Sequence, residues 1–282
     1  MPSLSMLKQM AGQDGHLPDA NAAQEKSRLS LGVPAIDGCL SGGLARHGLH
    51  EVRCAHGRDI GAATGFALSL LARAGKAGGS VAGRVLWIID PAAAVDGGLP
   101  FADGLRQHGI DAGRLVLVRP SRLKDAVWSA GEAARCGELA AVIVQIRGNP
   151  AAFDATASRR LLLRARENGV FTMVLRQSGG EEASAALTRW HARACPSLPD
   201  EGLYGEQTPW GIGRMRLALT LEKNRNGQTG QWHVSWNPRT GAFEHAAQNP
   251  QTAHPGNPLS VSCHRPDRPP EMGQVLALGR AS

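Results

Sequence analysis

Four short apolar runs constrain the fold of this 282-residue chain more than any other feature. Each run is continuous rather than alternating, which is typical of parallel strands covered on both faces. The runs cover residues 84–90, 115–118, 141–144 and 170–175. Helix-patterned segments lie at about 61–75, 100–108, 121–137 and 154–168. The sequence therefore predicts an α/β fold with a mostly parallel central sheet.

The pattern changes after residue 186. Apolar and polar residues alternate in 187–193, 214–221 and 231–236, as expected for antiparallel strands. The last two of these segments are joined through Asn226-Gly227, a strong hairpin signal. We expect antiparallel strands at the C-terminal edge of the sheet.

Both ends of the chain have the composition of disordered segments. Residues 1–28 are polar and rich in Ala, Gln and Gly, and residues 246–282 carry six prolines among polar residues. Such segments bury too little apolar surface to offset the entropy lost on ordering. The sequence thus predicts one domain over 29–245 between two flexible tails.

The formal net charge is +7, and most of the positive charge comes from arginine. Arginine suits contacts with phosphate or with an acidic partner, although an Arg- and Ala-rich composition is also typical of GC-rich coding sequence. The five cysteines are scattered, and the histidines form no metal-binding pattern. We expect no metal site, no membrane segment and a cytoplasmic location.

A strand, a glycine-containing loop and a helix follow one another over residues 50–71, as they do around a Walker A motif. That motif, Gly-x-x-x-x-Gly-Lys-Ser/Thr, cradles phosphates with backbone amides and adds a lysine and a magnesium-binding hydroxyl. The candidate loop residues here are His56, Gly57, Gly61, Ala62, Ala63 and Thr64. With Gly61 as the second glycine, Ala62 replaces the lysine and Ala63 the hydroxyl residue, so the loop favours a binding role over ATP hydrolysis.

Residues 29–37 (LSLGVPAID), 40–44 (LSGGL) and 50–52 (HEV) resemble the segment that leads into the Walker A loop of the RecA/RadA recombinase core. The resemblance extends over residues 29–240 as an order of elements. Residues 134–137, 156–161 and 188–190, with the altered loop, more specifically resemble the ImuA family. A RecA-like core is the fold that this resemblance implies.

The resemblance also implies a role in damage-induced translesion DNA synthesis during the SOS response. The expected partners are ImuB, which is a Y-family polymerase-like protein, and an error-prone C-family DNA polymerase. RecA and DNA are further candidate contacts, and no cofactor is expected.

Two more active-site positions differ from what the resemblance implies. Ala92 aligns with the catalytic glutamate of RecA-type enzymes, and Gln145 aligns with the Walker B aspartate that holds magnesium. Phosphoryl transfer depends on positioning and charge neutralisation, so losing these groups together with the lysine leaves little catalysis. We therefore expect a non-catalytic adaptor, with weak nucleotide binding through Gly57, Gly61 and the helix N-terminus still open.

Two groups of residues are candidates for contacts with DNA or a partner. The first group, Arg159, Arg160 and Arg164, gathers on the helix at 154–168. The alternative is that these arginines form an ordinary solvated helix face.

The second group lies in the last third of the domain. Arg189, Trp190 and Trp210 are candidate exposed anchors, with local packing as the alternative. Lys223 and Arg225 match a basic pair that contacts the neighbouring subunit in recombinases, with a solvated hairpin tip as the alternative.

Two rival functions stay open. One is a divergent DNA-dependent ATPase with a lysine supplied from elsewhere, such as Lys76 or Lys223. The other is an SOS cell-division inhibitor, because RecA-like inhibitors of that type exist.

Overall fold

A computed structural model describes residues 27–76, 83–197, 213–225 and 227–246. Of the two predicted tails, only residues 27, 28 and 246 fall within these ranges. The expected disorder of the tails therefore stays a prediction.

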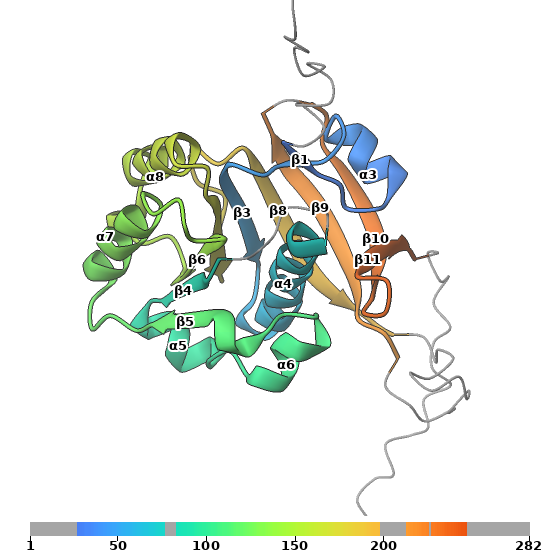
Figure 1. Ribbon diagram of the computed structural model, residues 1–282, viewed down its shortest axis with the longest axis horizontal. Coiled ribbons are helices and arrows are strands. Elements are labelled where there is room, and N and C mark those ends of the chain that lie inside the picture. The colour runs from blue at the N-terminus through green and yellow to red at the C-terminus, as the bar shows by residue number, and fades with distance from the viewer. Residues whose placement is uncertain (1–26, 77–82, 198–212, 226, 247–282) are drawn as a thin grey trace, which may run out of the picture. The chain divides into compact units, whose positions relative to one another are not determined.

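A nine-stranded mixed sheet forms the centre of the described structure (Figure 1). Its strands, in spatial order, are β11 (Ala242–His245), β10 (Gly230–Asn237), β9 (Arg216–Asn224), β8 (Thr188–Cys195), β3 (Gly48–Cys54), β7 (Phe171–Gln177), β6 (Ala141–Arg147), β4 (Val85–Ile89) and β5 (Leu115–Val118). The six strands from β8 to β5 run parallel, whereas β9, β10 and β11 are antiparallel. The predicted α/β class, with its antiparallel C-terminal edge, is confirmed.

Helices cover both faces of the parallel part (Figure 1). α4 (Ile60–Lys76) packs on one face, and α7 (Leu123–Ala133) and α8 (Ala155–Glu167) pack on the other. Strand β4 shows why its sequence is continuously apolar: Trp87 and Ile89 enter the core on the α4 side, while Ile88 enters the core on the α7 side. The sheet therefore separates two apolar cores.

The remaining elements are short. They are β1 (Arg28–Leu29), α3 (Pro34–Cys39), β2 (Leu44–Ala45), the 3₁₀ turn η1 (Gly57–Asp59), α5 (Pro91–Gly97), α6 (Ala102–Gln107), and the 3₁₀ turns η2 (Ala112–Arg114) and η3 (Ala151–Phe153). Strands β1 and β2 pair with each other, outside the large sheet.

Several boundaries differ from the sequence prediction. β6 continues to Arg147 because Ile146 is buried on the α7 side, so Gln145 lies inside the strand rather than after it. β8 is antiparallel only to β9 and pairs parallel with β3, since side-chain alternation carries no information about a neighbour's direction. α5 and β11 were not predicted at all.

His50 is a titratable residue of β3 with no exposed surface. Its Nε2 lies 2.8 Å from the Ala45 carbonyl oxygen and its Nδ1 lies 2.8 Å from Thr188 Oγ1. The Trp190 indole N–H donates to the same hydroxyl at 3.1 Å. Burial lowers the pKa of His50 to about 4 from its ordinary 6.5, so the ring is neutral at pH 7.

The buried histidine predicts a loss of stability in mild acid. Because the pKa is lower in the folded than in the unfolded chain, the stabilisation is complete above pH 6.5 and is lost as the pH falls towards 4. The free energy of unfolding should drop by about 2 kcal/mol between pH 7 and pH 5, measured by urea denaturation. The free energy of unfolding of a His50→Gln variant should fall clearly less between pH 7 and pH 5. The control is His47→Gln, at an exposed histidine, which should behave as wild type does. Equal losses in wild type and His50→Gln would contradict the assignment.

Candidate functional site

The loop expected to cradle a phosphate forms a tight connection between β3 and α4. His56 is exposed and extended, with φ −123° and ψ 147°, and Gly57 opens the turn η1. α4 already begins at Ile60, so Gly61 lies in its first turn. Gly61 is exposed and has open space around the position of a side chain. The candidate loop residues are thus brought together around one helix N-terminus.

The side chains at this N-terminus provide little positive charge. Ala62 and Ala63 take the positions expected for the lysine and the hydroxyl residue of the motif. Both are buried in the core between α4 and the sheet. Arg58 is exposed, and Asp59 follows it within η1. The carboxylate of Asp59 interacts favourably with the positive end of the helix dipole. A bound phosphate would use the same end of the helix.

Gln145 is fixed inside the sheet rather than presented at its edge. It is 3% exposed, and its Oε1 accepts a hydrogen bond of 3.2 Å from the Trp87 indole N–H. Its backbone carbonyl accepts from the Asp90 N–H at 2.9 Å. Ala92, at the expected glutamate position, is exposed in the first turn of α5.

α5 lies against the carboxyl end of β6. Asp96 of this helix forms an ion pair of 2.7 Å with Arg147, the last residue of the strand. Gly97 packs so closely that an added Cβ would lie 2.8 Å from Gln177 Oε1 and 3.0 Å from Gln145 Nε2. The helix thus places its backbone directly over two buried amide side chains.

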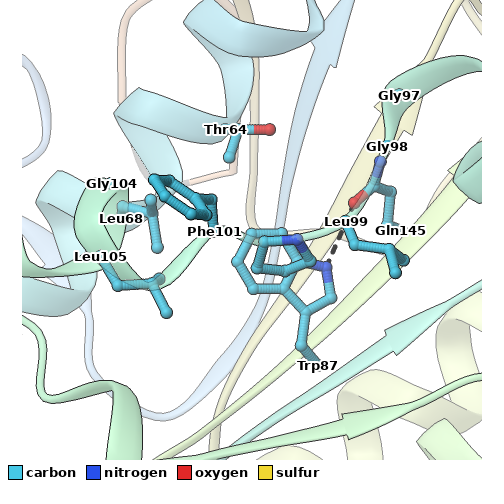
Figure 2. Close-up of a pocket in the computed structure, with 11 residues that line it drawn as sticks. Thr64, Leu68, Trp87, Gly97, Gly98, Leu99, Phe101, Gly104, Leu105 and Gln145 are labelled. Atoms are coloured by element: carbon cyan, nitrogen blue, oxygen red, sulfur yellow. Dashed lines mark hydrogen bonds between the residues drawn. The ribbon is translucent and has the colours of Figure 1, made fainter.

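A small pocket opens beside this arrangement (Figure 2). Its volume is about 160 Å³, and its walls include Thr64 and Leu68 of α4 and Trp87 and Gln145 of the sheet. The remaining lining residues are Gly97, Gly98, Leu99, Pro100, Phe101, Gly104 and Leu105. Phe101 stands at the rim with 69% of its surface exposed. The walls are largely apolar, and Thr64 and Gln145 are brought together here.

These residues do not fit a magnesium nucleotide. Such a ligand needs fixed cations around its phosphates and an acidic residue for its metal. Around α4's first turn the described residues offer exposed Arg58, Asp59 and two buried alanines, and Gln145 is already bonded to Trp87. No step of phosphoryl transfer can be derived from this geometry.

Arg189 and Trp190 are not exposed, so their prediction as surface anchors is wrong. Trp190 has no exposed surface and packs edge-on against Phe66 of α4, with ring centroids 5.3 Å apart. Arg189 is 7% exposed. Alternation along β8 directs Trp190 into the α4 core and Arg189 into the opposite face. Trp210 lies outside the described residues.

Arg189 belongs to a buried ion network centred on Glu51. Glu51 Oε1 accepts from Arg176 Nε at 2.8 Å, and its Oε2 accepts from Arg189 Nε at 3.2 Å. Burial alone would raise the pKa of Glu51, but the two arginines outweigh it and hold the pKa below its ordinary value. Arg176 also donates to the Gly148 carbonyl at 2.7 Å. The network joins β3, β7 and β8.

Lys223 and Arg225 both lie near the turn that joins β9 to β10, but only Arg225 is in that turn, as the hairpin-tip alternative predicts. Lys223 lies within β9 opposite Arg189 and donates to the Ser184 carbonyl oxygen. Burial, assisted by the charges of Arg189 and Arg225, lowers the pKa of Lys223. Arg225 is exposed just after the strand, and its backbone N–H donates to Leu187 at 2.9 Å. The pair is adjacent, yet only Arg225 is fully presented to solvent.

The three arginines of α8 also divide. Arg159 and Arg160 are exposed, whereas Arg164 is half-buried and pairs with Glu132 of α7 at 3.1 Å. On α7, the sequence prediction overlooked Trp128, which is 68% exposed. Its signal was the helical spacing of Ala126, Ala130 and Ala133, which puts the small residues on the buried face and the tryptophan on the other.

Comparison with known proteins identifies the family. No protein-family model matches the chain. Protein ImuA from Caulobacter vibrioides strain NA1000 / CB15N is 33% identical over 225 residues, which cover 72% of this chain and 81% of that protein. Protein ImuA from the Caulobacter vibrioides strain ATCC 19089 / CIP 103742 / CB 15 gives the same values. The chain belongs to the ImuA family. The resemblance to this family seen in the sequence is thereby confirmed.

In this ImuA-family chain, no helix within the described ranges is both long and apolar enough to span a bilayer.

The Glu51 network predicts a large stability loss when its centre is removed. Glu51→Ala leaves two guanidinium groups buried without their carboxylate, which should lower the free energy of unfolding by about 3–5 kcal/mol in chemical denaturation. Asp103→Ala removes the carboxylate of an exposed ion pair with Arg106 and should cost about 0–1 kcal/mol. Similar losses in the two variants would show that the network contributes no more than a surface pair.

Proposed function

We propose that this chain is a non-catalytic RecA-like adaptor in the SOS mutagenesis response of the cytoplasm. It brings together ImuB and an error-prone C-family polymerase during damage-induced translesion synthesis. Membership of the ImuA family supports the pathway. RecA and DNA are further candidate contacts.

One observation carries the non-catalytic part of the proposal. Gln145, at the position of a metal-binding aspartate, is bonded to Trp87 while Gly97 of α5 packs against its amide. The carboxyl end of β6 is therefore occupied by the protein's own groups. Since catalysis of phosphoryl transfer relies on charges fixed at that edge, the geometry favours binding without hydrolysis.

With the pocket unsuited to chemistry, the proposed activity lies on the protein's surfaces. An adaptor holds its partners through exposed side chains on a rigid scaffold. Here the scaffold is the sheet with an apolar core on each of its faces. Exposed aromatic and arginine side chains are the residues that dominate protein interfaces.

ATP turnover tests the non-catalytic assignment. The full-length protein should hydrolyse labelled ATP only at background rate, with or without single-stranded DNA, because a buried alanine, Ala62, follows Gly61 where the motif has its lysine. Gly61→Asp is a suitable variant, since it has open space and adds an acid to a helix's first turn while repelling phosphate. Gly38→Asp, at another exposed helical glycine with open space, is its control. Turnover that Gly61→Asp abolishes and Gly38→Asp spares would establish the rival ATPase.

Co-purification tests the adaptor role. Tagged full-length protein should retain purified ImuB. It should not retain the bacterial tubulin homologue of cell division, which is the protein that an inhibitor of the rival type blocks. Retention of the tubulin homologue without ImuB would replace the adaptor with a cell-division inhibitor. Binding of neither protein would remove the support for both functions.

A further inference from the structure

The outer surface of α7 carries an exposed tryptophan with no structural task in the described domain. Trp128 is 68% exposed, while Ala126 and Ala130 of the same helix are fully buried. A large aromatic side chain in water contributes no burial energy to folding, and such residues are enriched where another molecule binds.

α8 places positive charge beside this tryptophan. α7 connects β5 to β6 and α8 connects β6 to β7, and all three strands are parallel, so the two helices run in the same direction. The Arg164–Glu132 ion pair of 3.1 Å fixes their relative level. One helical turn before each of these residues come Arg160 and Trp128, which therefore stand at the same level on adjacent helices.

Leu163 completes this surface, which we name the α7–α8 face: Trp128, Arg159, Arg160, Leu163 and Arg164. Leu163 is 48% exposed, although it lies in the middle of a helix whose inner side is well packed. Arg159 and Arg160 are exposed, and within the described ranges neither forms an ion pair. The face thus combines two apolar side chains with two unpaired guanidinium groups.

We propose that the α7–α8 face is the docking surface for an acidic amphipathic segment of a protein partner. Apolar side chains of that segment cover Trp128 and Leu163, and its carboxylates pair with Arg159 and Arg160. The charge pattern decides between protein and nucleic acid. Exposed Arg166 adds positive charge on α8, but Glu132 and the exposed Glu167 interrupt it, so a few carboxylates placed at the arginines fit this face better than an unbroken run of phosphates.

The first test measures binding of the full-length protein to the purified Y-family polymerase-like protein, a probe whose choice rests on the proposed function. Trp128→Ala should weaken binding about tenfold or more, and Arg160→Glu should weaken it comparably by reversing the charge. Val95→Ala, at another exposed apolar side chain, and Arg193→Glu, at an exposed arginine of β8, are the controls and should bind as wild type does.

The outcomes separate the two proposals. Wild-type binding that all four variants retain would overturn the docking surface and leave the adaptor role standing. Absence of wild-type binding would overturn the adaptor role, and the docking surface is then judged by a second measurement that does not use this partner.

That measurement follows the indole N–H signal of Trp128 by NMR, assigned from its loss in Trp128→Phe. A short synthetic peptide with leucine at helical spacing and glutamate elsewhere should shift the signal at about millimolar concentration, and its lysine-for-glutamate counterpart should not. No shift with the acidic peptide, or an equal shift with the basic one, overturns the proposal. A shift with a single-stranded oligonucleotide alone would also overturn it and assign the face to nucleic acid.

Discussion

A carboxylate held between two arginines in the middle of the sheet is the constraint on which the described structure most depends. Glu51 of β3 bonds Arg176 of β7 and Arg189 of β8, and these three residues are between 2% and 7% exposed. β3 lies at the centre of the sheet, with β7 on one side and β8 on the other. A buried charge without its partner is costly, so the two ion pairs favour the arrangement in which β3 lies between β7 and β8.

This arrangement has consequences at the carboxyl edge of the sheet. The central strands fix where the η1 turn begins after Cys54 and where Arg147 and Gln177 end their strands. α5 closes on that edge through the Asp96–Arg147 ion pair and the close approach of Gly97. The edge where an α/β protein usually binds its ligand is thus partly covered by the chain itself, whereas exposed Trp128, Arg159 and Arg160 lie elsewhere, on α7 and α8.

Much of the fold could be predicted from the sequence because buried parallel strands need continuous apolar runs. The runs at 141–144 and 170–175 correspond to the buried strands β6 and β7, and the helix at 154–168 corresponds to α8. The candidate site was only partly predictable. The loop residues from His56 to Thr64 do gather at one helix N-terminus, but α5 was not foreseen, since seven residues beginning with proline give too short a pattern. For Trp190 the sequence left exposure and local packing both open, because its neighbour Arg189 suggested solvent.

The sequence by itself determined the fold class, the residue types in the loop at 56–64 and the family, since all three reside in residue identity and local order. Only the tertiary structure decided which side chains are available. It buried Arg189 against Glu51 and Trp190 against Phe66, bonded Gln145 to Trp87, and exposed Trp128 beside α8. The physical reason is that burial and charge pairing depend on strands and helices distant in the chain, and no local pattern specifies which of these become neighbours.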